Sequence, residues 1–482
     1  MLKDIIKKEI LDHLLSAKFI FMFIICSVLI LLSVYMGAVD YLTNKKTHEA
    51  DEAQIMQALA PPNNWSTITD GALRVYRRPQ TLSTLVKGVE DAAGRASYTH
   101  LPEVSLSESK HESNPLTSVF GAFDLMFIVK MVLSLFAILL MHDVICGEKE
   151  KGTLKLALSN SVPRDRLLLG KAVGGYISLC VPLVFPLLIS LIYLSLHTGI
   201  DFSGEDWQRI GFIFLMFLLY LTVFFCLGLL VSSLTARSST SLLILLSVWC
   251  VWGIILPKAS VIIAGHLRSI PTANEIYTRK TAFVTQLNQE YVQNAAQKGA
   301  ELGAKLWLKF NITSTDSPEY QEYLKELDEL IQKVTKELYK ERAGKIAENT
   351  SRIDRDFQRE KDAQVALAKN LSRVSPASAL TFSATALAQT GIDEYNRFLK
   401  ATQEYKPVIS NWVNTDPGIR NERGALKVID SDALAAMPRL TVESERLSRT
   451  FVRILPDLIS MIVMIALLTG GAYFAFIRCD VR

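Results

Sequence analysis

The sequence predicts an all-α membrane protein with six transmembrane helices, an N-terminal interfacial helix and a largely helical extracytoplasmic domain built from two insertions. Half of the 482 residues are hydrophobic and 21% are charged, a balance too apolar for an ordinary soluble protein and too polar for a chain confined to the bilayer. Six apolar segments reach the roughly 20 residues that a hydrocarbon core about 30 Å thick requires of a helix. Two long polar segments between them supply the extracytoplasmic domain.

The apolar segments place the transmembrane helices at residues 19–39, 122–146, 172–196, 210–234, 242–265 and 454–477. The first segment is too long for the core of a signal peptide and no small-residue cleavage site follows it, so we expect it to remain in the protein. Residues 1–18 precede it, and they place at helical spacing Ile5, Ile6, Ile10, Leu14 and Leu15, with lysines mainly on the other side. A basic amphipathic helix of this kind lies in the membrane interface; the alternative is a simple extension of the first transmembrane helix.

Lysine and arginine predict which connections are cytoplasmic, because short cytoplasmic loops are enriched in both. Residues 147–171 hold six of these cations, whereas residues 197–208 hold three carboxylates and no cation. The N-terminal segment, the turn before the fifth helix and the tail at 478–482 agree with a cytoplasmic location. We therefore predict that both termini are cytoplasmic and that residues 40–117 and 266–453 lie outside.

The second polar segment is rich in Glu, Lys, Gln and Ala, and its pattern predicts helices at about residues 273–310 and 317–371. Pro257, Pro271 and Pro376 interrupt the pattern. The length of the two helices favours helical hairpins or a coiled-coil stalk. The alternative is a solvated helical insert that binds nothing.

A charged stretch, CGEKEKGTLKLALSNSVPRDRLLLGK, lies between the second and third apolar segments. Gly147 ends the second helix, Asn160 and Ser161 offer caps, and Pro163 suits the first turn of the next helix. The stretch therefore predicts a short helix lying across the cytoplasmic face, followed by a sharp return into the membrane. Such a helix is suited to docking on a soluble partner; the alternative is an ordinary positively charged loop.

The sequence contains no pattern typical of catalysis. A phosphate-binding loop needs G-x-x-x-x-G-K-[ST], and DRLLLGKA has Gly170 and Lys171 without the leading glycine or the final hydroxyl residue. The seven histidines lack metal-ligand spacing, and the six cysteines lie in or beside apolar segments, so the polar segments are not disulfide scaffolds. The net charge of +4 suggests no nucleic-acid partner. We expect no catalytic residue, no metal site and no cofactor in this chain.

Four ionisable residues lie in or near the apolar segments, where charge is costly and usually has a partner or polar surroundings. Asp124, Lys258 and Asp457 lie near predicted outer ends, where their side chains can reach water. Lys130 lies about two turns inside the second helix, where it can extend outward or pair with Asp124. We predict that Asp124, Lys130 and Asp457 line a pathway or a helix interface.

The stretch GEKEKGTLKLALSNSVPRDRLLLGK resembles the E-x-E-x-G-T-L and R-x-x-hydrophobic-x-G-K signature of type-2 ABC (ABC-2) exporter permeases. The resemblance extends through the six apolar segments, the N-terminal helix, known in that family as the elbow helix, and the ending FIRCDVR. VYRRPQTLSTLVKG and SRVSPASALTFSATALAQTG resemble the subgroup with large extracytoplasmic insertions. The resemblance to the family covers the membrane half of the chain well and the two insertions only in patches.

The resemblance implies that residues 147–171 form a coupling region that seats in a groove of a separate ATPase subunit. By motif position this region contains Glu148, Glu150, Gly152 and Thr153, with Arg164 and Lys171 at its exit into the third helix. The two carboxylates are then docking contacts rather than general acids or bases. The region acts as a lever that is moved when two ATPase subunits close around ATP.

The complex that the resemblance implies lies in the lipid bilayer of a bacterial cytoplasmic (inner) membrane. It contains two permease copies, identical or pseudo-symmetric, and two ATPase subunits that carry ATP and Mg. Transport would follow mainly the first, second and fifth helices, and the extracytoplasmic domain would cap the exit, select cargo or bind an envelope protein.

Two alternatives remain open from the sequence. In a mechanotransmission complex, ATP hydrolysis would move the long outer helices to act on an envelope protein, and nothing would cross the membrane. A structural or signalling anchor that uses no ATP is disfavoured by the coupling-type stretch.

Overall fold

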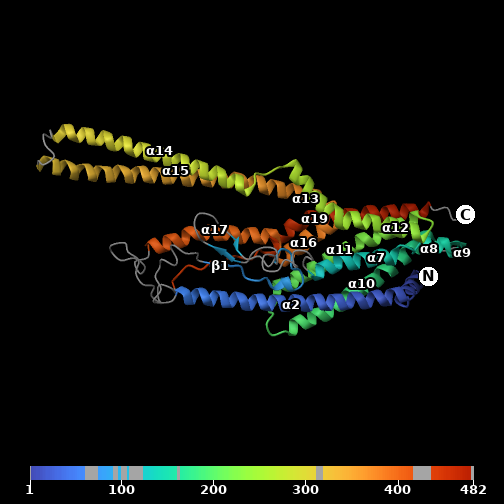
Figure 1. Cartoon of the computed structure of the whole chain (residues 1–482). Helices are drawn as coiled ribbons and strands as arrows, with labels where there is room; N and C mark the ends of the chain where they lie inside the picture. Colours follow the sequence, from blue (N-terminus) through green and yellow to red (C-terminus); the bar gives the residue numbers. More distant parts are fainter. Residues whose placement is uncertain are drawn as a thin grey trace. The chain divides into compact units, whose positions relative to one another are not determined.

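The structure, a computed structural model, describes residues 2–59, 74–90, 96–98, 106–107, 123–159, 163–310, 318–415 and 436–478. The chain forms two compact units, Met1–Lys258 with Ser372–Arg482, and Ala259–Leu371. Helices dominate both units, which confirms the predicted all-α fold class (Figure 1).

Six helical segments among the described residues are long and apolar enough to cross a membrane, and they correspond to the six predicted transmembrane helices. The first is α2 (Ala17–Leu59). The others are α6 (Leu125–Phe127) with the π-helix η2 (Ile128–Leu133) and α7 (Ser134–Met141); α10 (Arg164–Leu196); α11 (Gly204–Leu234); α12 (Ser238–Cys250) with the π-helix η3 (Val251–Ile255) and α13 (Leu256–Leu267); and α19 (Leu447–Ile477).

The first transmembrane helix is much longer than predicted. At a rise of 1.5 Å per residue, the 43 residues of α2 extend about 65 Å, roughly twice the thickness of the hydrocarbon core. The predicted segment at 19–39 forms the first half, and the second half belongs to the first insertion. Residues 40–59 contain neither proline nor glycine, so nothing in the sequence stops the helix where the apolar run ends.

The core of the first unit surrounds α11, on which α7, α16 and α19 pack. Phe217, Tyr220 and Phe224 of α11 are fully buried. The short helix α16 (Pro376–Ala388) comes from the second insertion, yet it is buried along most of its length against α11 and α19. Ser375 caps its first turn by accepting a hydrogen bond from the Ser378 N–H. Part of the second insertion therefore belongs to the same unit as the transmembrane helices.

The two insertions are joined by close backbone contacts. The 3-10 helix η1 (Thr81–Thr84) lies directly on α2, because a Cβ added to Gly37 would stand 2.2 Å from the Thr84 carbonyl oxygen. Four residues beyond η1, Gly88 adopts a positive φ of 56°, and the Val89 N–H donates to the Thr390 carbonyl oxygen at 2.9 Å, directly after α16. The two stretches that resemble the insertion-bearing subgroup thus pack against each other.

A small antiparallel sheet lies within the first insertion, which the sequence did not predict. Its strands are β1 (Arg74–Tyr76), β2 (Ala96–Tyr98) and β3 (Leu106–Ser107), in the order β1-β2-β3. Val75 pairs with Ser97 in the register of β1 and β2. Further along the chain, α16 is followed by α17 (Ile392–Thr415), whose neighbours include this insertion.

The second unit contains two long helices, α14 (Ala273–Phe310) and α15 (Pro318–Ser372), close to the predicted ranges. They run side by side as a hairpin (Figure 1). Polar contacts recur along their length, including ion pairs between Lys280 and Asp354 and between Lys309 and Glu326, each at 2.7 Å. The prediction of a helical hairpin is confirmed.

Candidate functional site

The predicted coupling region begins with the short helix α8 (Cys146–Glu150), which is fastened to α11 at its first residue. The preceding helix α7 ends at Met141, and a turn leads into α8. The backbone N–H groups of Ile145 and Cys146 both donate to the hydroxyl of the fully buried Ser232 on α11, at 3.0 and 3.2 Å. The start of α8 is therefore held inside the bundle.

Three consecutive side chains of α8 contact three different transmembrane helices. Because successive helical residues are about 100° apart, such a run projects in three directions. Glu148 Oε1 lies 2.7 Å from Lys171 Nζ of α10, Lys149 Nζ donates to the Ser233 carbonyl oxygen at the end of α11, and Glu150 Oε2 accepts from the N–H and hydroxyl of Ser238 at the start of α12. The short helix α8 therefore has polar contacts with α10, α11 and α12 at once.

Lys171 connects α8 and α10 to the N-terminal helix α1 (Leu2–Leu14). The side chain of Lys171 is buried, and its Nζ lies 3.4 Å from both carboxylate oxygens of Glu9. Glu9 also has His13 Nε2 at 3.6 Å. Burial alone would raise the pKa of Glu9, but the neighbouring His13 and the charge of Lys171 outweigh it and lower the pKa. Glu9 is thus held as a carboxylate between α1 and α10.

The helix α1 lies on a glycine-rich face of α10. A Cβ added to Gly170 would stand 2.5 Å from Ile5 Cγ2, and one added to Gly174 would stand 2.8 Å from Glu9 Cβ. Along the predicted apolar face, Ile5, Ile6, Ile10 and Leu14 are half-buried. Leu15, which follows the last residue of α1, is 76% exposed. The N-terminal helix predicted from the sequence is present, and glycine allows its close approach.

We expect Gly174→Leu to displace α1 from α10, because the nearest atoms include the Ile6 backbone oxygen at 3.2 Å, which cannot rotate away. Overpacking of this kind costs about 1–3 kcal/mol. Thermal unfolding of the purified chain should therefore show a lower midpoint. Gly211→Leu is the matched control, because a Cβ at Gly211 of α11 meets nothing within 4 Å. Equal midpoints for the two variants would contradict the contact between α1 and α10.

Gly152 supports a sharp turn between α8 and the next helix, α9 (Thr153–Ser159). Its φ of 74° is disfavoured for other residues, and its N–H donates to the Lys149 carbonyl oxygen at 3.1 Å. Thr153 Oγ1 donates to the Glu148 carbonyl oxygen at 3.4 Å. In α9, Leu154 is buried and Leu156 is 67% exposed. The short surface helix predicted from the sequence is therefore present as α9.

The return into the membrane differs slightly from the prediction. Asn160 and Ser161, the predicted caps, lie outside the described residues. Pro163 stands at the N-cap of α10 rather than in its first turn, because its ψ of 134° is extended and the helix begins only at Arg164. Arg164 Nη1 donates to the Ile477 carbonyl oxygen at 2.7 Å and so covers the end of α19.

The six predicted coupling residues therefore lie at one end of the first unit. Among them, the Glu148 side chain pairs with Lys171, and the Glu148 carbonyl oxygen accepts from Thr153. In Figure 1, α8 and α9 lie at the end of the bundle that carries the N-terminus. The Glu148 and Glu150 carboxylates accept hydrogen bonds from this chain, and their role in docking stays a prediction. Sequence reasoning missed Glu9, Lys149 and Ser238. Only the alternating charges around Lys149 hinted at a role.

The intramembrane carboxylates are buried, contrary to the expectation that they reach water. Asp124 is 3% exposed and caps the second transmembrane helix by accepting from the Phe127 N–H at 2.8 Å; the Lys87 N–H also donates to it at 3.0 Å. Asp457 is 2% exposed and lies 2.7 Å from Arg373 Nε. Both expectations failed because the partners come from the insertions, which a search of the apolar segments alone does not include.

Lys130 lies in the π-helix η2 and is half-buried. No hydrogen bond or ion pair joins its ammonium to Asp124 or to another residue in the described part of the chain, so the suggested Lys130–Asp124 pair does not form. Its carbonyl oxygen accepts from the Tyr220 hydroxyl at 2.8 Å. Trp249 Nε1 of α12 donates to Ser134 Oγ at 2.9 Å, one residue after η2. The π-helix therefore has a polar contact with α11, and the residue after it has one with α12.

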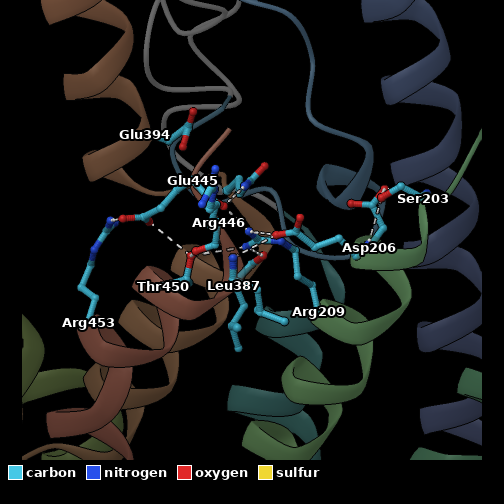
Figure 2. A network of polar contacts seen from close by, with 12 residues as sticks. Ser203, Asp206, Arg209, Leu387, Glu394, Glu445, Arg446, Thr450 and Arg453 are labelled. Carbon is cyan, nitrogen blue, oxygen red and sulfur yellow. Dashed lines mark hydrogen bonds and ion pairs between the residues drawn. The ribbon is translucent and has the colours of Figure 1, made fainter. Parts of the chain in front are cut away.

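A second polar cluster lies at the end of the bundle opposite to α8, where α11 begins (Figure 2). At its centre is Arg209, which is 1% exposed. Its guanidinium donates to Glu205 at 2.7 Å, to the Leu387 carbonyl oxygen at 3.1 Å, to Thr450 Oγ1 at 3.5 Å and to the Glu445 carbonyl oxygen. Arg209 therefore connects α11 to α16 and to the start of α19.

The cluster around Arg209 continues into α17 through a chain of ion pairs. The Glu445 carboxylate contacts Arg453 and, at 3.5 Å, Arg397. Arg453 in turn lies 3.5 Å from Asp393, and Arg397 pairs with Glu394. None of these residues was a predicted site residue. An arginine four residues after a glutamate at the start of an apolar helix, as in Glu205 and Arg209, was the available signal.

Among the described residues, six helices are long and apolar enough to cross a membrane, which defines a multi-pass membrane protein. Comparison with known families agrees with this class: the sequence model of a family described as ABC-2 family transporter protein matches residues 4–481. The chain belongs to this family, which confirms the resemblance seen in its motifs. No curated protein shows a significant match to the chain.

Proposed function

We propose that this chain is the permease subunit of an ATP-driven exporter, in which two permease copies work with two separate ATPase subunits that bind ATP and Mg. The family supports a role as the membrane component of a transporter. The observation that carries the proposal is the set of contacts made by Glu148, Lys149 and Glu150, which join α8 to three transmembrane helices. A coupling element has to make such contacts.

The proposed mechanism is mechanical. The ATPase would contact the outer surface of α9, where Leu156 is exposed, and its closure around ATP would displace α9 and α8 together. The buried Lys171 and Ser232 would pass this displacement to α10 and α11. The lever requires rigidity, and the side chains of α8 provide it without any covalent chemistry in this chain.

The proposed orientation places α1, α8, α9 and both termini in the cytoplasm, because lysine and arginine gather in these segments. The insertions then lie outside a bacterial cytoplasmic membrane. The second permease copy would pack on the least buried transmembrane helices, α2, α12 and α19. The family resemblance implies export along the first, second and fifth transmembrane helices, and the first and fifth would lie at this interface.

A second candidate is a mechanotransmission complex, and the hairpin of α14 and α15 favours it. The 55 residues of α15 extend about 80 Å, far more than a cap over an exit would need. In this alternative the outer helices would act on an envelope protein and nothing would cross the membrane.

Co-purification tests the shared part of both candidates. The full chain would be expressed with candidate ATPase subunits and isolated in detergent, and ATP hydrolysis would be measured with and without the chain. We expect a stable complex with two copies of each subunit and faster hydrolysis. Failure to bind any ATPase would refute both candidates, whereas a dimer interface sealed with and without nucleotide would refute export alone.

A further inference from the structure

A cavity of about 700 Å³ lies in the first unit, outside the transmembrane segments. Four parts of the chain form its walls: the second half of α2, residues 75–80 beginning in β1, α17, and residues 437–444 before α19. Pockets that bind small organic ligands measure about 300–1,000 Å³ and are mostly apolar with a few polar groups. The size of this cavity therefore suits a ligand rather than a few water molecules.

Most of the wall is apolar. Met56, Val75, Met437 and Leu440 contribute aliphatic surface from three of the four parts. Tyr405 of α17 adds its ring alone, because its hydroxyl donates to the Pro438 carbonyl oxygen at 2.7 Å. Burial raises the pKa of Tyr405 to about 12, so the hydroxyl stays neutral. A ligand that fills this space needs an apolar body.

Arg77, which also lines the cavity, is a buried cation with unmet hydrogen-bonding capacity. It is 5% exposed, and neither terminal nitrogen has a hydrogen-bond acceptor within the described residues. It forms an ion pair with the buried Glu90, whose Oε1 lies 3.3 Å from Nη2 but outside hydrogen-bond geometry. Buried donors of this kind are rare in folded proteins, and guanidinium groups match carboxylates and phosphates geometrically.

The carboxylates that line the cavity favour a cationic ligand less than Arg77 favours an anionic one. Glu394 is buried beside it and already pairs with Arg397. Burial raises the pKa of Glu394 despite the opposing charges of Arg397 and Arg77, which favours its neutral form. At the rim, the exposed residues Arg78 and Arg439 face the same space as the exposed residues Glu49 and Glu52. The unmet N–H donors of Arg77 thus favour an anion despite Glu90, while the rim is balanced in charge.

We propose that this cavity binds an anionic amphiphile, whose carboxylate or phosphate is held by Arg77 and whose apolar body lies against Met56, Val75, Met437, Leu440 and the ring of Tyr405. Arg77 favours a ligand with an anionic group, and the apolar walls favour a ligand with an apolar body. Together they select anionic amphiphiles. The proposal goes beyond the proposed function and is independent of it, because binding requires neither the ATPase nor transport.

Binding to the purified full-length chain tests the proposal. The chain would be placed in nanodiscs of phosphatidylcholine, which carries no net charge, and titrated with radiolabelled oleate, oleoyl-lysophosphatidic acid and oleyl alcohol. We expect saturable binding of one anion per chain, and binding of the uncharged alcohol weaker by roughly tenfold or more, as loss of one charged hydrogen bond predicts. The oleate and phosphate arms show which anion is preferred. Equal affinity for the alcohol would overturn the proposal.

Two variants and one control place the ligand in the cavity. Arg77→Gln should weaken oleate binding by roughly tenfold, since it removes the charge. Leu440→Trp, which keeps every charge and fills the half-buried wall, should abolish binding even if Arg77→Gln does not fold. Lys400→Gln is the control, because this exposed lysine of α17 does not line the cavity. Unchanged binding in a folded Leu440→Trp variant would refute the site.

Discussion

The double substitution Glu148→Lys and Glu150→Lys is expected to abolish stimulation of the partner ATPase while all six helices still insert. At position 148 a new ammonium would face the buried Lys171, and like charges in a buried site repel strongly. At position 150 it would face the N–H groups at the start of α12, where the helix dipole favours an anion. ATP hydrolysis by the reconstituted complex is the measurement.

Asp12→Lys provides a matched control for the double variant. It makes the same change of charge in α1, on an exposed residue at the same end of the bundle. We expect its ATPase stimulation to equal that of the unmodified chain. Normal stimulation in the double variant would show that residues 147–171 only set membrane topology, and the lever mechanism would have to be abandoned.

Replacing Arg209 by glutamine is expected to cause the largest loss of stability. The substitution removes the charge that joins Glu205 to the carbonyl oxygens of Leu387 and Glu445. Breaking a buried charge cluster by removing one partner typically costs about 3–5 kcal/mol. Thermal unfolding of the purified chain should show a clearly lower midpoint, and limited proteolysis should cut more readily near α16 and α17.

The control for Arg209 is Arg446→Gln in the same cluster (Figure 2). The side chain of Arg446 is exposed, so its replacement should change stability by no more than about 0.5 kcal/mol. If the two variants unfolded at the same temperature, Arg209 would not hold the insertions to the bundle. Testing both in the same detergent removes the effect of the detergent from the comparison.

The parts of the fold that depend on local composition could be predicted. Apolar length is sufficient to locate a transmembrane helix, and for that reason the six segments and the hairpin of α14 and α15 are close to their predicted positions. The end of the first helix was missed, because a change from apolar to polar composition ends the membrane crossing without ending the helix. The strands β1, β2 and β3 are too short to give a periodic signal.

The partners of the site residues could not be predicted, because they come from distant parts of the chain. The motif located Glu148 and Lys171, but Glu9 lies 162 residues before Lys171. The expectation that Asp457 reaches water was wrong, because its partner Arg373 lies in an insertion rather than in a transmembrane helix. Arg209 was overlooked since the sequence does not indicate that its carbonyl partners will surround it. Such contacts follow from tertiary packing rather than from spacing.

The hydrogen bond between Val89 and Thr390 also constrains the order of events during synthesis. Residues 81–90 leave the ribosome early, but their partner follows only after four more transmembrane helices have been made. Contacts between such distant residues form late. Until Thr390 has been synthesised, residues 81–90 lack this backbone partner and stay accessible to proteases and chaperones. A chain interrupted before Thr390 would therefore leave the Val89 N–H without its backbone partner.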